Sequence, residues 1–202
     1  MTTTTYDYDP DSAGKADDVA GRIDVSAAYI GQFKNVHTIK SERTGTEGIH
    51  FEFSSPGGGA ASFDVYTRKE DGTNTFGMNQ VNAMQTILGL RGLKSAPGKI
   101  EVFEDGKRVE ADGEVFPDLM NKDIGLVLQK ELYTKQNGQE GYRMNLFGIF
   151  HPVSRLTASE IKEKKTQPEK VEKMLRSLKT KDSRTAQVAE PAQPAIGGAT
   201  GF

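Results

Sequence analysis

The stretch IHFEFSSPGGGAASFDVYT, residues 49–67, decides the fold of this chain. Apolar side chains occupy every second position from Ile49 to Phe53 and again from Phe63 to Val65, with polar residues between them. A period of two predicts two strands that each bury one face. The run SSPGGG that separates them predicts a turn. The segment is therefore expected to form two consecutive strands of a sheet.

The same alternation precedes this stretch. Residues 21–33 alternate between apolar and polar positions and predict a strand that continues over residues 36–41 after a break. Further along the chain, apolar residues recur at helical spacing and then again at every second position. The remaining predicted elements are a helix at 77–91, a hairpin at 100–115, a turn at 117–122, strands at 124–132 and 142–150, a helix that a capping box opens at Thr157, and a helix at 168–180.

This order of elements predicts the fold class. Five antiparallel strands with a helix between the third and the fourth follow the order of a five-stranded OB-fold barrel. We therefore expect a mainly β protein, an OB-fold barrel with an inserted hairpin and C-terminal helices. No strand–helix–strand crossover is visible, which argues against a doubly wound dinucleotide-binding fold.

Composition divides the chain into four parts. Residues 1–20 are polar and acidic and predict a disordered segment, whereas residues 183–202 are rich in Ala, Pro and Gly and predict a disordered tail. Between them lie the expected OB-fold domain, 21–156, and a C-terminal helical region, 157–182. The first part holds one lysine and five aspartates, and residues 157–184 hold nine basic and five acidic residues. This asymmetry suggests an electrostatic partner or competition between the ends, or else only a solvated head and an ordinary charged helix.

Composition also excludes several classes of protein. The chain has no cysteine, which excludes a disulfide scaffold, a cysteine nucleophile and thiolate metal sites. His37, His50 and His151 show no metal-site spacing, so no metal or other cofactor is expected. No apolar run approaches the roughly 18–20 residues of a membrane span, and the first residues lack the features of a secretory signal. A cytoplasmic location is expected.

No catalytic constellation is evident in the sequence. The glycine cluster at 55–60 lacks the Lys-Ser/Thr of a phosphate loop, and no nucleophile elbow is present. A nuclease would have Asp64 and Glu52 as its carboxylates if they faced one another across strands. Like charges directly opposite each other are costly, so an offset of one register step is the simpler interpretation. The chain is expected not to be an enzyme.

Aromatic residues beside basic ones recur along the chain instead. Single-stranded nucleic acids bind where bases stack on aromatic rings inside a basic groove. The candidate nucleic-acid-binding residues are Phe33, Lys34, His37, Lys40, Arg43, Tyr66, Arg68, Lys69, Lys130, Tyr133, Lys135, Tyr142 and Arg143. Tyr66 is expected to point outward, because Phe63 and Val65 beside it face the core. The alternative is that these tyrosines pack in the core, above all Tyr142, which shares a face with Met144 and Leu146.

Four segments carry a resemblance to a known family. They are TGTEGIHFEFSSPGGGAASFDVYT, GMNQVNAMQTILGLRGL, GEVFPDLMNKDIGLVLQKELY and GYRMNLFGIFHPVSRLTASEI, spread over about residues 21–180. They resemble phage-type single-stranded DNA-binding proteins of replication and recombination gene clusters, and FPDLMNKDIGLVLQKE and SRLTASEI are the most specific parts. The resemblance implies an OB-fold, coating of single-stranded DNA in the host-cell cytoplasm, and no catalysis. It supplies no binding motif, so the site residues rest on the aromatic and basic pattern alone.

One alternative function belongs to another class. The OB-like barrel would be only a scaffold, and helix 168–180 would dock a recombinase or replication protein of the phage. The oligomeric state stays open at this point, with a dimer among the options.

Overall fold

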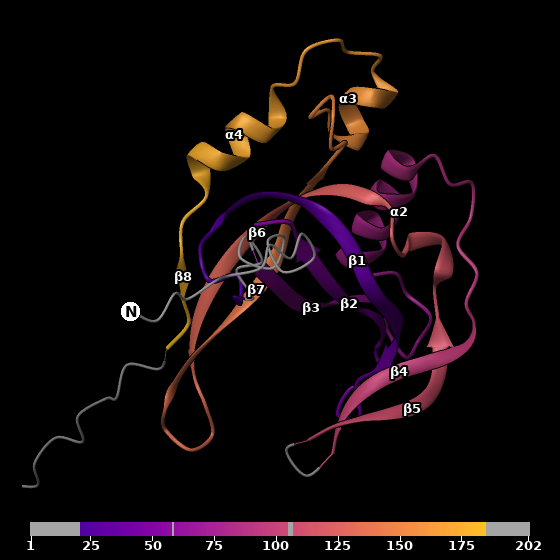
Figure 1. Cartoon of the computed structure of the whole chain (residues 1–202), viewed down its shortest axis with the longest axis vertical. Coiled ribbons are helices and arrows are strands. Elements are labelled where there is room, and N and C mark those ends of the chain that lie inside the picture. Colours follow the sequence, from indigo (N-terminus) through magenta and orange to yellow (C-terminus); the bar gives the residue numbers. More distant parts are fainter. Residues whose placement is uncertain (1–20, 58, 105–106, 185–202) are drawn as a thin grey trace, which may run out of the picture.

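The chain folds into a mainly β structure whose strands follow the predicted order (Figure 1). The computed structural model describes residues 21–57, 59–104 and 107–184. Within this part of the chain the elements are β1 (Ala27–Lys40), β2 (Glu47–Ser55), β3 (Gly59–Arg68), α2 (Phe76–Leu88), β4 (Ala96–Glu104), β5 (Lys107–Val115), the 3-10 turn η1 (Pro117–Leu119), β6 (Asp123–Thr134), β7 (Glu140–Phe150), α3 (Ala158–Lys162), α4 (Lys170–Ser177) and β8 (Lys181–Asp182).

β1 is the long strand that joins the two halves of the sheet. Its first half, Ala27 to Gln32, pairs with β6, and its second half, Gln32 to Lys40, pairs with β2. The hydrogen-bonded order runs β3-β2-β1-β5-β4, while β6 also pairs with β7 and with the short β8. Every pairing is antiparallel except that of β8 with β6. The C-terminal strand β8 is an element that the sequence did not predict.

The sheet is open, which corrects the expectation of a closed barrel. In the described residues no backbone ladder joins β3 to β7, although side chains from both line one groove. Two features keep the strands apart. Residues 21–23 occupy the start of the β3 edge, where Ile23 N donates to Ala60 O at 2.8 Å. At the other end α2 lies between them, and Gln80 Nε2 donates to Leu146 O at 2.9 Å. We call this gap between β3 and β7 the seam.

The first predicted strand begins later than expected. Residues 21–26 lie outside the strands, apart from a bridge between Arg22 and Ala60. Ile23 and Val25 were expected on one face, yet Ile23 is 2% exposed and Val25 is 60% exposed. The alternation fails because this segment crosses the seam toward β6, where Lys130 N donates to Ser26 Oγ at 2.9 Å.

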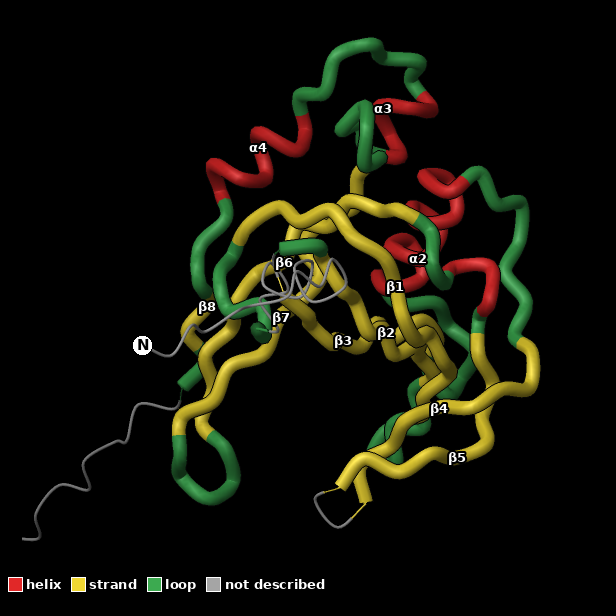
Figure 2. Tube along the Cα trace, in the orientation of Figure 1, coloured by secondary structure: helices red, strands yellow, loops and turns green. Residues whose placement is uncertain are grey.

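The predicted inserted hairpin is confirmed as β4 and β5. The two strands pair along their whole length and extend from the sheet as one arm, opposite the arm formed by β6 and β7 (Figure 2). The hairpin joins the sheet through β1, where Val115 pairs with His37 and Phe116 N donates to Val36 O at 2.9 Å. β1 and β2 therefore separate it from β3.

Phenylalanine rings from β1, β2 and β3 fill the core. The ring centroid of Phe33 lies 4.9 Å from that of Phe51, which lies 5.4 Å from that of Phe63. Helix α2 covers the core with Val81 and Met84, both buried. The alternation in β2 and β3 and the helical stripe in α2 thus predicted the buried faces of these three elements correctly.

Helix α4 packs its apolar stripe on the outer side of β6 and β7. Val171 is fully buried with Val127 and Phe150, and Met174 and Leu178 pack against them. The stripe predicted on this helix is confirmed, but it is covered by the sheet. This stripe is therefore not free to dock a partner.

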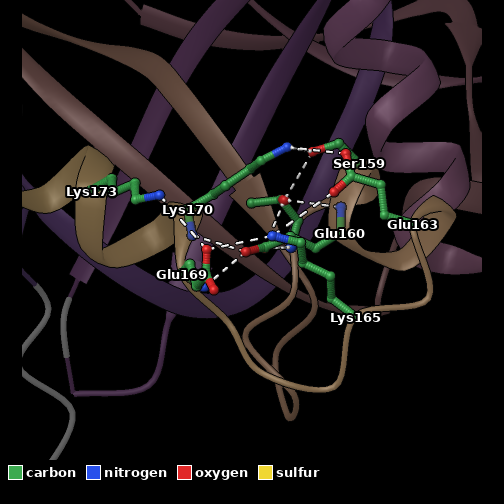
Figure 3. A network of polar contacts seen from close by, with 8 residues as sticks. Ser159, Glu160, Glu163, Lys165, Glu169, Lys170 and Lys173 are labelled. Carbon is green, nitrogen blue, oxygen red and sulfur yellow. Dashed lines mark hydrogen bonds and ion pairs between the residues drawn. The ribbon is translucent and has the colours of Figure 1, made fainter.

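A buried carboxylate ties α3 to α4 (Figure 3). Glu160 is 0% exposed and accepts hydrogen bonds from Thr157 N, Thr157 Oγ1 and Glu169 N at 2.8 Å each, and from Lys170 N at 2.9 Å. The predicted capping box at Thr157 is thereby confirmed. Burial raises the pKa of Glu160, but these hydrogen bonds outweigh it and lower the pKa to about 2. The ionised carboxylate holds the first turn of both helices.

We expect Glu160→Gln to lower the free energy of unfolding by about 1–3 kcal/mol at pH 7, because an amide NH₂ would face backbone donors that lose their acceptor. The folded-state pKa lies below the ordinary 4.5, so the contribution is complete above that value and disappears as the pH falls toward about 2. Urea unfolding of both proteins at pH 7, 5 and 3 measures this difference.

Glu163→Gln is the matched control for this experiment. Its exposed carboxylate makes only ion pairs, with Lys165 and Lys170 at 4.0 and 3.6 Å. We expect a change within about 0.5 kcal/mol. An equal loss in both variants, or a loss at Glu160 that does not depend on pH, would contradict the role assigned to the buried carboxylate.

Candidate nucleic-acid interface

A groove of about 490 Å³ follows the seam between β3 and β7. Side chains from β2, β3, β6 and β7 line it, together with one residue of the crossing segment 21–26. We call it the seam groove. The lining residues that bear on its chemistry are Arg22, His50, Asp64, Tyr66, Tyr133, Tyr142, Arg143 and Asn145.

Tyr66 supplies the exposed aromatic ring of the seam groove. Along β3, Phe63, Val65 and Thr67 are buried while Asp64 and Tyr66 are exposed, so the predicted outward orientation is confirmed. The Tyr66 side chain is 41% exposed and lies outside the apolar core. In the sheet, β2 and β1 lie between the strand of Tyr66 and the hairpin of β4 and β5, so its ring does not pack against that hairpin.

Tyr142 has a different role from the one expected. Its ring packs partly against the core, as the core alternative held. The Arg22 guanidinium carbon lies 4.8 Å from the ring centroid and Lys130 Nζ lies 4.7 Å from it. These distances are typical of cation–π contacts. The ring therefore has two cations beside it.

Tyr133 and Arg143 form a second aromatic and basic pair at the groove. The guanidinium carbon of Arg143 lies 5.7 Å from the centroid of the Tyr133 ring. Arg143 Nε donates to Glu131 Oε2 at 3.0 Å, and 58% of its side chain is exposed. This hydrogen bond raises the pKa of Arg143, so the guanidinium stays charged. Lys135 is exposed at the end of the same hairpin.

The assignment of Phe33 and His37 as nucleic-acid-binding residues is wrong, because both side chains are buried. Phe33 is 0% exposed in the ring cluster of the core. His37 is 6% exposed, stacks on His50 with ring centroids 4.9 Å apart, and has its pKa lowered first by burial and then by His50. Phe33 falls on the apolar side of the alternation in its own strand and therefore faces the core. His37 lies opposite His50, on the face of β2 away from the core phenylalanines, and is buried between β2 and β5.

The remaining predicted cations are exposed but scattered. Lys40 and Arg68 each pair in register with Glu47 from opposite sides and line a separate hollow beside α2. Lys34 lies near the turn before β3. Arg43 and Lys69 lie in turns at the far ends of β1 and β3. The structure therefore places Tyr66, Tyr133, Tyr142 and Arg143 in the lining of one groove, with Lys130 beside Tyr142, and places the others elsewhere.

Four groove residues, Arg22, His50, Asp64 and Asn145, were not predicted from the sequence as nucleic-acid-binding residues. His50 Nδ1 lies 2.6 Å from Asp64 Oδ1, and the two residues are directly opposite across β2 and β3. Apolar and polar residues alternate in both strands, and this alternation already places His50 and Asp64 on the outward face. Arg22 reaches the groove only because its segment crosses the seam, which no local pattern indicates.

The carboxylates considered for a nuclease do not face each other. Asp64 opposes His50, and Glu52 opposes Ser62, so the offset favoured from the sequence is confirmed. Among the described side chains, no group of three or more His, Cys, Asp or Glu is arranged to hold a metal ion. Within the same residues, no helix has the length and apolar character needed to cross a membrane.

Comparisons with known proteins assign no family to the chain. No protein-family model matches its sequence. No curated protein is significantly similar to it. The functional argument therefore rests on the geometry of the seam groove and on the resemblance described above.

We expect Phe33→Ala to lower the free energy of unfolding by about 3–5 kcal/mol, since a buried aromatic ring leaves a large cavity. Tyr66→Ala removes a half-exposed ring and is expected to lower it by less than about 1 kcal/mol. Thermal unfolding of both variants measures the contrast. Comparable losses would show that Tyr66 is part of the packing and is not available to a ligand.

Proposed function

We propose that the protein binds single-stranded DNA along the seam groove without sequence preference. The observation that carries this proposal is that the exposed Tyr66 ring and the cations Arg22 and Arg143 line one groove. Lys130 lies beside Tyr142, another ring of the lining. Basic grooves with aromatic platforms are the general means of binding single strands. The resemblance to phage-type single-stranded DNA-binding proteins supports the same function.

Each group has a distinct part in the proposed mechanism. A base stacks on Tyr66, a contact worth about 1–3 kcal/mol that every base can make. Phosphates are neutralised by Arg143 and by Arg22 and Lys130, which Tyr142 holds together. Since stacking and charge do not depend on base identity, binding is independent of sequence. The Asp64 carboxylate is engaged by His50, which limits its repulsion of the strand.

The order of elements supports an OB-type architecture for this site. OB-folds are partly open barrels that bind oligonucleotides on the face of their second and third strands and on neighbouring loops. In this chain β2 and β3 contribute His50 and Tyr66, and the β6–β7 hairpin contributes Tyr133 and Arg143. The open seam lies beside this face, where a DNA strand would bind.

The proposed activity involves no catalysis. In phage replication and recombination, such a protein would cover transient single strands and keep them open, and recombinase or replication proteins would act on the same strands. The interaction-module alternative is not favoured, because the apolar stripe of α4 lies against Val127 and Phe150.

Salt dependence of binding tests the proposal directly. If Arg22, Lys130 and Arg143 each neutralise one phosphate, the log of affinity for oligo-dT should fall with the log of salt concentration with a slope of about −2. Fluorescence anisotropy of a labelled oligonucleotide at four salt concentrations gives this slope. No binding at low salt, or binding with a flat salt response, would overturn the proposed function.

We expect Tyr66→Ala to weaken oligo-dT binding by about 1–3 kcal/mol, or about 5- to 150-fold, because it removes the stacking ring. Tyr66→Phe keeps the ring and should retain most of the affinity. Phe76→Ala is the matched control, since Phe76 is 74% exposed but does not line the seam groove. Equal losses for Tyr66→Ala and Phe76→Ala would remove Tyr66 from the site.

A further inference from the structure

A buried carboxylate lies directly behind the seam groove. Glu131 is on β6 and is 2% exposed. Two groove residues donate to its Oε2: Arg143 Nε at 3.0 Å and Asn145 Nδ2 at 2.6 Å. The hydrogen bond from Arg143, together with those from Ser183, Lys181 and Asn145, holds the pKa of Glu131 far below its usual range. Glu131 is thus an anion at every pH at which the protein would meet DNA.

The second oxygen of the same carboxylate binds the C-terminal strap, residues 181–184. Ser183 Oγ donates to Glu131 Oε1 at 2.6 Å, and Lys181 Nζ lies 2.9 Å from it. Backbone contacts fix the strap beside β6, where Ser183 N donates to Leu132 O at 2.9 Å. One side chain therefore connects the wall of the groove to the last described residues of the chain.

The hydrogen bond to Glu131 determines which edge of Arg143 faces outward. A guanidinium has five donors in a rigid planar fork, and Arg143 uses Nε for Glu131. Its two Nη groups remain for a phosphate, in the geometry that suits bidentate binding. A free arginine would have to order its long side chain each time it bound a strand. Glu131 has already imposed that order.

We infer that Glu131 is the positioning residue of the seam groove: it holds Arg143 and Asn145 in place for the strand, while the C-terminal strap fixes its other oxygen. This inference rests on the proposed function. Glu131 itself does not touch DNA. It acts through Arg143, and the strap acts through Glu131.

The direction in which Glu131→Gln changes the affinity for oligo-dT distinguishes a positioning role from a simple effect of charge. Glu131→Gln removes a negative charge beside a groove that binds phosphates, so charge alone would tighten binding. Loss of positioning has the opposite effect, because the amide of glutamine has one acceptor oxygen, which cannot face both Arg143 with Asn145 and the strap. We expect affinity for oligo-dT to fall about tenfold, as for the loss of one charge-assisted hydrogen bond. We also expect the salt slope to lose about 0.7, the value for one phosphate on a single strand.

Three further variants complete the test. Arg143→Ala should show the same loss of affinity and slope, and the double variant Glu131→Gln/Arg143→Ala should lose little more, because the two residues act as one unit. Glu52→Gln is the matched control: it removes the same charge from the outward side of β2 and touches neither Arg143 nor the strap. It should bind as well as the parent or more tightly, with the parental slope.

A measurement on the parent protein covers the case in which Glu131→Gln does not fold. The Arg143 Nε–H signal in ¹⁵N NMR spectra should be protected from exchange with water and should shift when oligo-dT is added. Rapid exchange of this proton, or parental affinity and slope in folded Glu131→Gln, would overturn the positioning role alone. A parent protein that does not bind oligo-dT would overturn the proposed function and this inference with it.

Discussion

Contacts among phenylalanine rings on the inner face of β1, β2 and β3 are the interaction on which the rest of the structure depends. Phe33, Phe51 and Phe63 pack ring against ring and bend three strands around one centre. Every second residue of these strands therefore points outward. Tyr66 owes its exposure to this constraint, because it lies between two positions that the core fills. The chemistry of the groove is thus a consequence of apolar packing on the opposite face.

Contacts between segments that are distant in the sequence then determine which of the outward-facing residues come together at the seam groove. Residues 21–26 cross the seam and bring Arg22 to Tyr142, while Glu131 draws Arg143 toward the C-terminal strap. The first arrangement joins residues that are more than a hundred positions apart. The second depends on a segment that follows the main strands of the sheet in the sequence. Charge is concentrated at the seam by these contacts, whereas Lys40 and Arg68 are left facing Glu47.

Features that follow from a regular spacing of apolar residues were predicted correctly from the sequence. Features that depend on irregular segments or on distant contacts were not. Alternation located the strands, the helical period located α2 and α4, and Tyr66 was assigned to the correct face. Phe33 was misassigned although the alternation of its own strand places it with the core residues, and His37 was misassigned because it is buried between β2 and β5, which are distant from it in the sequence. Closure of a barrel depends on whether β3 and β7 meet, and no local pattern encodes that meeting. Arg22 and Glu131 were missed for the same reason.

Both ends of the β3 edge are covered, which has a consequence for solubility. Arg22 bridges to Ala60 at the start of the strand and Asn74 bridges to Arg68 at its end. Unpaired strand edges are templates for edge-to-edge aggregation, and native proteins shorten or cover them. Among the described residues, only the middle of β3 remains unpaired on that side. The cover at both ends shortens the stretch of this edge that another chain could pair with.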